Sequence, residues 1–189
     1  MDSTLAEAKG KRVFWVISIV LVAVYAAYAL GKIKTLPCKA GWLQAFQRNF
    51  IHVNLTHLVA NLASFWILSR IELQHGTVNY AVLIAAILAL FTTAEVVMNR
   101  GKEPKQCAIG FSGVLFGLLA WEVVTNHVNL NAQLLVALIL SVVGTSLKNP
   151  RASLKGHLMG VFVGLVVGAV TRILQNKKGK MSNQIKFSF

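Results

Sequence analysis

Residues 157–174 read HLMGVFVGLVVGAVTRIL, and this apolar stretch decides what kind of fold the chain can have. A helix crosses a bilayer with about 20 consecutive, mainly apolar residues, so the stretch has the length of a membrane span. Gly160, Gly164 and Gly168 are spaced four apart and therefore share one face of that helix. Small residues at such spacing let helix backbones approach closely. The stretch thus predicts a membrane-spanning helix that packs tightly against a neighbour.

The composition of the whole chain agrees with this interpretation. The 189 residues are 56% hydrophobic and only 13% charged, and the mean hydropathy is +0.62. A disordered chain needs low hydrophobicity, and a disulfide-rich scaffold needs more than the two cysteines present. The net charge of +13 could suggest that the protein binds nucleic acid. That function needs a soluble fold with a polar, basic surface, and this chain has too few polar residues to form one. The composition predicts an integral membrane protein with basic loops that binds no nucleic acid.

Five more apolar runs lie before the stretch 157–174 in the sequence. The six runs together predict an all-α, multi-pass membrane protein with a six-helix bundle at 13–174. A basic segment at 1–12 comes before this membrane domain, and a basic, polar tail at 175–189 follows it. The longest loop, at 31–51, is expected to carry short interfacial helices. The six runs cover 13–30, 52–73, 80–98, 107–125, 130–147 and 157–174.

The orientation in the membrane is left open by charge. Six spans place both termini on one side, and basic residues should then be more numerous on the cytosolic side. The 19 lysines and arginines divide nine to ten between the two sides, with nine on the side of the termini. The positive-inside rule therefore selects neither orientation.

Polar side chains gather at the starts of the second, fourth and sixth runs. The second opens with HVNLTHLVAN at 52–61, the fourth contains GFSG at 110–113, and the sixth opens with HLMG at 157–160. These three helices cross the membrane in the same direction, so their starts lie at one depth. Each polar residue could serve helix packing or a core hydrogen bond, yet polar groups inside a membrane are costly and usually functional. At this depth the helices can therefore bring together a serine, two histidines and an asparagine.

These residue types suit nucleophilic catalysis. A serine hydroxyl is a weak nucleophile until an adjacent base takes its proton. Ser112 would attack a carbonyl, with His157 acting first as general base and then as general acid. The developing oxyanion requires donors that are fixed before the reaction. The Ser112 N–H at a helix start, the His57 ring and the Asn61 amide could supply them.

The acidic residues narrow the mechanism further. Asp2 is the only aspartate, which excludes an aspartyl protease with its pair of intramembrane aspartates. Glu103 is the one glutamate expected near the helix starts, so we infer a Ser–His dyad rather than the triad of soluble serine proteases. No histidine precedes a glutamate in an HExxH zinc-protease pattern. Although His52, His57 and His157 could in principle bind a metal, we expect no metal and no cofactor.

The ordered motifs resemble the rhomboid family of intramembrane serine proteases. GFSG at 110–113 is similar to the family's GxSG, residues 157–164 to its HxxGxxxG, and residues 52–61 to its HxxxxHxxxN. Glu72 and Gly76 resemble its ExxxG. The resemblance spans roughly residues 42–172 and keeps the family's order of motifs.

This resemblance implies the six-helix rhomboid core and a serine endopeptidase that cleaves transmembrane segments of membrane proteins. Ser112 is then implied as the nucleophile and His157 as the base, with Phe116 stacking on the catalytic histidine. The implied oxyanion and substrate-binding residues are His57, Asn61, Gly110 and Phe116. The alternative is a catalytically inactive, derlin-like member of the fold that binds client membrane proteins, although such proteins typically lack the serine or the histidine.

The resemblance also implies a location. It places the termini in the cytosol and the active site towards the exoplasmic or lumenal side, in the endoplasmic reticulum or the plasma membrane. The string CAIGFSGVLF at 107–116 is most similar to the eukaryotic endoplasmic-reticulum branch of the family. One departure lies in the first loop, where Trp42 and Arg48 are not adjacent although the family usually has a Trp-Arg pair.

Four further residues carry expectations of their own. Cys38 and Cys107 lie in loops on the same predicted side, where they could pair in an oxidising compartment or remain unpaired. Glu95 and Glu122 lie within the third and fourth apolar runs. We expect both glutamates near helix ends, close to water and outside the catalytic machinery.

Overall fold

The computed structural model describes residues 10–34, 41–100, 107–125, 140 and 154–186, and within these ranges all regular structure is helical. This confirms the expected all-α class. The expected span at 130–147 lies outside the described residues, apart from Leu140. The helices are α2 (Arg12–Ala29), α3 (Trp42–Arg48), α4 (Leu55–Leu68), α5 (Arg70–His75), α6 (Thr77–Asn99), α7 (Ser112–Thr125) and α9 (Leu154–Lys186).

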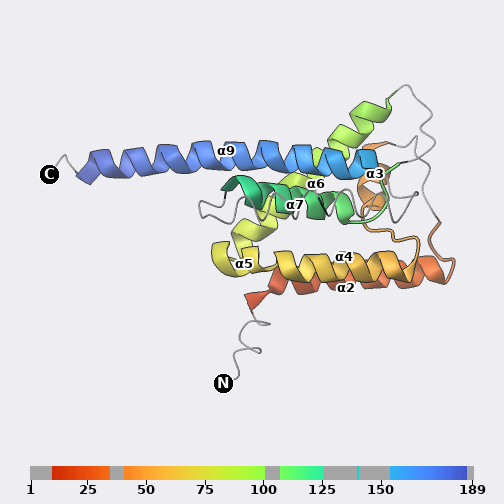
Figure 1. Cartoon of the computed structure of the whole chain (residues 1–189). Helices are drawn as coiled ribbons and strands as arrows, with labels where there is room; N and C mark the ends of the chain where they lie inside the picture. Colours follow the sequence, from red (N-terminus) through yellow and green to blue (C-terminus); the bar gives the residue numbers. More distant parts are fainter. Residues whose placement is uncertain (1–9, 35–40, 101–106, 126–139, 141–153, 187–189) are drawn as a thin grey trace, which may run out of the picture.

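The helices form a bundle in which α4, α7 and α9 all begin at the same end (Figure 1). The common end also holds α3, while α2 begins and α9 finishes at the opposite end. The α7 helix packs most extensively on α9, and α6 contacts both. The three helices start at the same end of the bundle, as expected for spans that cross the membrane in the same direction.

In the described part of the chain, three helices are long and apolar enough to cross a membrane: α2, α6 and the part of α9 up to Lys177. The α7 helix is a shorter apolar helix of 14 residues. The 33 residues of α9 make it about 50 Å long at 1.5 Å per residue. In Figure 1 it extends well beyond the other helices, so the predicted tail is helical as far as Lys186.

Two predicted spans differ from the helices observed. The run at 52–73 is divided into α4 and α5 at Ser69, and Gly76 with φ of +83° separates α5 from α6. The fourth run begins as a helix at Ser112 rather than at residue 107. Gly110 has φ of +95°, which lies outside the right-handed helical region, so the helix starts only after it.

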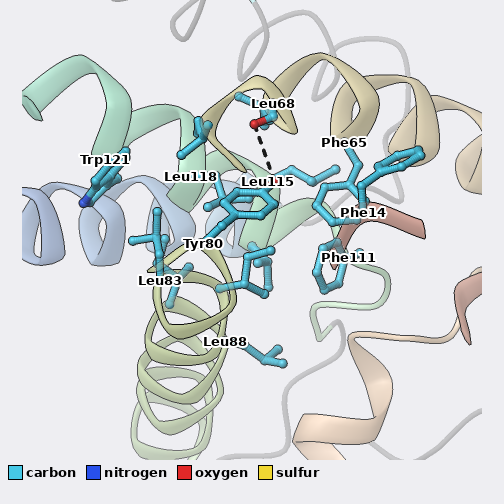
Figure 2. Packing of buried hydrophobic residues seen from close by; sticks show 14 of the residues in the cluster. Phe14, Phe65, Leu68, Tyr80, Leu83, Leu88, Phe111, Leu115, Leu118 and Trp121 are labelled. Atoms are coloured by element: carbon cyan, nitrogen blue, oxygen red, sulfur yellow. Dashed lines mark hydrogen bonds between the residues drawn. The ribbon is translucent and has the colours of Figure 1, made fainter. Parts of the chain in front are cut away.

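The core of the bundle lies between α2, α4, α6 and α7, where aliphatic side chains surround a group of aromatic rings (Figure 2). The fully buried Phe65 of α4 has its ring centroid 5.1 Å from that of Phe14 and 5.5 Å from that of Phe111. On its other side Tyr80 of α6 stacks at 6.4 Å, and the tyrosine hydroxyl donates to the Leu68 carbonyl at 3.5 Å. Because Phe111 directly precedes α7, this core anchors the start of that helix.

The contact between α7 and α9 is made by glycines. A Cβ added at Gly160 would meet the carbonyl oxygen of Gly113, and one added at Gly164 would meet that of Gly117. The two backbones therefore touch, as predicted from the glycines spaced four residues apart in α9.

Buried acidic residues hold the helix ends together. The Glu72 carboxylate of α5 accepts the N–H of Val13 at 2.9 Å and that of Phe14 at 3.3 Å. These are the first amides of α2, which have no acceptor within their own helix. Glu72 is 1% exposed and thus caps α2 inside the protein.

The expectation that Glu95 and Glu122 lie close to water is wrong, because each is 3% exposed. Each carboxylate instead pairs with an arginine from another helix, Glu95 with Arg48 at 2.9 Å and Glu122 with Arg70 at 2.8 Å. The sequence places both glutamates in apolar runs but does not show that an arginine reaches them. A partner charge makes burial of a carboxylate tolerable.

Candidate active site

The hydroxyl of Ser112 lies 3.2 Å from Nε2 of His157, within hydrogen-bonding distance. Ser112 is the first residue of α7, and His157 lies near the start of α9. The serine is half-buried and the histidine is 6% exposed. Both side chains sit at the common end of the bundle, so the structure brings together the two residues predicted to be catalytic.

The glycine contact sets the separation of this pair. Gly113 follows the serine directly, and Gly160 lies three residues, or nearly one helical turn, beyond the histidine. A Cβ at Gly160 would enter the space of the Gly113 carbonyl. With any other residue there, α9 would have to move away from α7 and carry His157 with it.

Phe116 packs on the imidazole from the following turn of α7. Its ring centroid is 4.6 Å from that of His157, with an angle of 46° between the planes. The contact predicted for this aromatic residue is therefore present, in a tilted rather than a stacked geometry. Phe116 is 8% exposed and limits the rotation of the histidine ring.

The His57 ring lies against the backbone of Gly110. A Cβ added at Gly110 would be 2.5 Å from Cε1 and 3.0 Å from Nε2 of that ring. The start of α4 is fixed by Asn54, whose side-chain oxygen accepts the His57 N–H at 2.8 Å. The buried His52 ring lies 4.9 Å from that of His57. Gly110 is thus required both for its left-handed backbone and for the close approach of His57.

Asn61 lies one turn further along α4. Its amide Nδ2 donates to the carbonyl of His57 at 2.8 Å, and the residue is 4% exposed. Among the hydrogen bonds of the described residues, none joins Asn61 to Ser112 or His157. The structure therefore places Asn61 on the helix of His57, with one of its two amide hydrogens engaged within that helix.

The glutamates of the described helices are held by other partners. Glu72 accepts amides of α2, Glu95 pairs with Arg48, and Glu122 pairs with Arg70. Glu103, the acidic residue expected nearest the helix starts, lies outside the described residues. Within the described ranges no three His, Cys, Asp or Glu side chains group in a way that could hold a metal ion.

The segment between α6 and α7 contains two polar features beside the serine. The Ala108 N–H donates to Glu95 at 3.2 Å, and the Gly110 N–H donates to the Arg48 carbonyl at 3.0 Å. Cys107 is disulfide-bonded, whereas Cys38, the partner considered for it, lies outside the described residues. The sequence offered one signal for the Arg48–Glu95 contact, namely a lone glutamate inside an apolar run.

The site thus consists of a serine and a histidine in contact at the starts of two helices of a membrane bundle. This arrangement is typical of an intramembrane serine protease fold, and the comparisons with known proteins point to the same class. The model of the Rhomboid domain matches residues 39–173. The chain therefore belongs to the rhomboid family.

Three relatives illustrate this membership. The rhomboid protein L523 of Acanthamoeba polyphaga mimivirus is 30% identical over 139 residues, which cover 73% of this chain and 78% of that protein. Rhomboid-related protein 4 of Homo sapiens is 29% identical over 167 residues, covering 77% and 52%. Rhomboid-type serine protease 2 of Gibberella zeae is 29% identical over 131 residues, covering 62% and 48%. The aligned part thus makes up about half the length of the last two.

Proposed function

We propose that the protein is an intramembrane serine endopeptidase that cleaves transmembrane segments of other membrane proteins. The observation that carries the proposal is the 3.2 Å contact between Ser112 Oγ and His157 Nε2 within a rhomboid-family membrane bundle. A relative from Gibberella zeae bears the name of a rhomboid-type serine protease, which agrees with this function.

In the first half of the reaction, Ser112 Oγ attacks the carbonyl carbon of the scissile peptide bond. His157 Nε2 takes the hydroxyl proton as the new C–O bond forms, because a neutral serine is a poor nucleophile. His157 then gives this proton to the leaving amine nitrogen, and the C–N bond breaks. In the second half, water attacks the acyl-enzyme with His157 again as base, the ester bond between Ser112 Oγ and the acyl carbon breaks, and His157 returns the proton to Ser112 Oγ. The dyad needs no cofactor.

The oxyanion formed in each half requires preorganised donors. The N–H of Ser112 is one, since the first amides of a helix have no acceptor within it. The His57 ring beside Gly110 and the second amide hydrogen of Asn61 are the other two donors that we assign. Gly110 and Phe116 shape the site from the two sides of the serine.

The substrate follows from the position of the site. Residues 13–174 form the membrane domain of the proposed enzyme, flanked by the segments 1–12 and 175–189. The termini face the cytosol, and Ser112 faces the exoplasmic or lumenal side, in the endoplasmic reticulum or the plasma membrane. A substrate helix must expose a carbonyl to Ser112, so small or helix-destabilising residues near its exoplasmic end are favoured.

Cleavage of a model transmembrane substrate by the purified protein tests the proposal. Ser112→Ala and His157→Ala are each expected to lower the rate by about 10³-fold or more, as removal of a nucleophile or base does in serine proteases. Ser64→Ala and His75→Ala are matched controls, because both side chains are exposed on other helices. A fluorophosphonate probe should label wild-type Ser112 and leave the Ser112→Ala variant unlabelled.

Unchanged cleavage in either catalytic variant would show that the dyad is assigned wrongly. A wild-type protein that neither cleaves nor labels, yet still binds the substrate helix, would instead identify a client-binding member of the family. The hydrogen-bonding distance between Ser112 and His157 favours the enzyme over this alternative.

A further inference from the structure

Two charged side chains that the proposed reaction does not use are buried beside the site. Nη2 of Arg48, the last residue of α3, lies 2.9 Å from Oε1 of Glu95 in α6, and the side chains are 2% and 3% exposed. The loss of hydration in a buried ion pair often cancels its attraction, and apolar residues of similar size can replace such a pair without loss of stability. Bundle stability alone therefore does not account for this one.

Both members of the pair also hold the backbone that leads into the catalytic serine. The Ala108 N–H donates to Oε1 of Glu95 at 3.2 Å, the same oxygen that binds Arg48. The Gly110 N–H donates to the main-chain carbonyl of Arg48 at 3.0 Å. The segment 107–111 forms no helix or strand of its own before α7 begins. These two hydrogen bonds tie the segment to α6 and α3, in addition to the disulfide at Cys107 and the buried Phe111 ring.

The same segment carries one wall of the oxyanion site. Gly110 lies directly against the His57 ring, close enough that a Cβ would be 2.5 Å from Cε1. Two residues later comes Ser112, whose hydroxyl and N–H both take part in the proposed reaction. A displacement of Gly110 would therefore change the position of Ser112 relative to His57.

Docking of α3 on α6 has other supports. The Trp42 indole N–H donates to Thr93 Oγ1 at 3.0 Å, and the Asn49 amide donates to Thr92 Oγ1 at 3.3 Å. Both contacts are independent of the ion pair. Removal of the two side chains should therefore leave α3 in place, together with the Arg48 carbonyl that binds Gly110, and release the Ala108 end of the segment before the serine.

We propose that Arg48 and Glu95 are a positioning pair for the peptidase reaction, an inference that rests on the proposed function. The pair touches neither substrate nor reacting atoms. It fixes Ala108 through the Glu95 carboxylate and the place of α3, whose Arg48 carbonyl binds Gly110, and thereby the geometry in which Ser112 and His57 receive the oxyanion. Small errors in such geometry are costly, since a misplacement of about 1 Å can lower a rate by about 10²-fold.

The decisive variant replaces both charges at once, Arg48→Met with Glu95→Leu. It leaves no unpaired buried charge, so we expect it to fold with an unfolding midpoint close to that of the wild type. It removes the acceptor of the Ala108 N–H. With a transmembrane peptide substrate, kcat should fall by about 30-fold while KM changes by less than about twofold. The rate of fluorophosphonate labelling at Ser112 should fall with kcat, because the adduct uses the same oxyanion site.

The single variant Glu95→Gln separates the acceptor from the charge. A glutamine oxygen can still accept from Ala108 and from Arg48, so we expect kcat within about fivefold of the wild type. The matched control is Arg70→Met with Glu122→Leu, which removes the ion pair near the other end of α7. The control should change stability without changing kcat or the labelling rate of the folded protein.

The two possible failures are distinct. A wild-type protein without cleavage and labelling overturns the proposed function, and the inference with it. An active wild type together with an equally active Arg48→Met, Glu95→Leu variant overturns the inference alone. Loss of kcat only in proportion to the folded fraction, or an equal loss in the Arg70–Glu122 control, also overturns it, because either result would mean that the pair acts through general stability.

Discussion

Two helix contacts in this bundle are built in opposite ways. Between α7 and α9, Gly113 and Gly117 meet Gly160 and Gly164 with no side chain between the backbones. Between α2 and α4 the contact is aromatic, and the Phe14 ring centroid lies 5.1 Å from those of both Phe65 and Trp66. The first contact lies beside the Ser112–His157 pair, whereas the second reaches the pair only through Phe111, the residue before Ser112.

The difference indicates what each contact can do. Backbone contact allows only one helix separation, because neither side has a side chain that could adjust. An aromatic contact buries more surface, but its rings can shift by some tenths of an ångström without moving the helix axes. We infer that the glycine contact fixes the catalytic distance and that the aromatic contact supplies stability. Six substitutions test this division.

The largest effect is expected at Phe65 in the aromatic contact. Phe65→Ala would leave a cavity between α2, α4 and α6 and lower the free energy of unfolding by about 3 kcal/mol, the low end for such truncations. The low end applies because lipid, unlike water, also solvates the exposed ring. Thermal or denaturant unfolding in micelles would measure the loss.

The cleavage rate per folded molecule should remain within about twofold of the wild type in Phe65→Ala, since no contact of the dyad is removed. Phe65 does touch Phe111, which precedes α7. A rate that falls by more than tenfold in fully folded protein would show that the aromatic contact also positions the serine, and the division would be wrong.

The next effect is expected in the glycine contact. Gly160→Ala would force the added methyl group against the carbonyl of Gly113 and move His157 away from Ser112. The cleavage rate should fall by about 10²-fold, which corresponds to about 2.7 kcal/mol in the activation free energy. Cleavage and fluorophosphonate labelling, both corrected for the folded fraction, are the measurements.

Gly168→Ala serves as the control for this substitution. Its added Cβ would lie 2.8 Å from Cβ of Val124, so it strains the same helix contact two turns further from the dyad. We expect a loss of stability with a much smaller loss of rate. Equal losses of rate at Gly160 and Gly168 would mean that helix separation as a whole, rather than the local spacing beside the dyad, limits the reaction.

The glycine contact could be predicted from the sequence, whereas the two ion pairs could not. The spacing of Gly160, Gly164 and Gly168 is a local pattern on one helix, and the direction of the spans predicts which helix starts meet. The pairing of Glu95 with Arg48 joins residues 47 positions apart on helices whose rotation the apolar pattern does not define. A helix that is apolar on all sides has no pattern to show which face meets its neighbours.

The helix boundaries illustrate the same limit. The break between α4 and α5 at Ser69 lies within the run 52–73, where the polar residues Ser69 and Arg70 do not show whether the helix continues or ends. The start of α7 at Ser112 depends on the positive φ of Gly110. Because glycine also occurs within the helices α7 and α9, a glycine in the sequence does not by itself mark a helix boundary. Apolar composition therefore indicated where helices lie in the described part of the chain, and backbone conformation decides where they begin and end.

A smaller effect is expected at the cap of α2, which supports the aromatic contact from its end. Glu72→Gln keeps an oxygen that can accept from Val13 or Phe14 but removes the negative charge at the helix start. The unfolding free energy should fall by about 1 kcal/mol, as for loss of a charged cap. Unchanged stability would show that the capping hydrogen bonds need no charge, and a changed cleavage rate would link this distant end to the dyad.

The smallest effect comes from making one substitution, phenylalanine to leucine, in each contact. Phe116→Leu removes the ring that touches the His157 imidazole and should lower kcat by about threefold, because a ring contact of this kind is worth about 0.5–1.5 kcal/mol. Phe14→Leu removes a ring of the aromatic contact and should lower only the unfolding temperature. Steady-state kinetics and thermal unfolding of both variants give four values. A drop in kcat for Phe14→Leu would mean that the aromatic contact also affects catalysis, and an unchanged kcat for Phe116→Leu would mean that this ring does not support the histidine; either result would contradict the separation of roles.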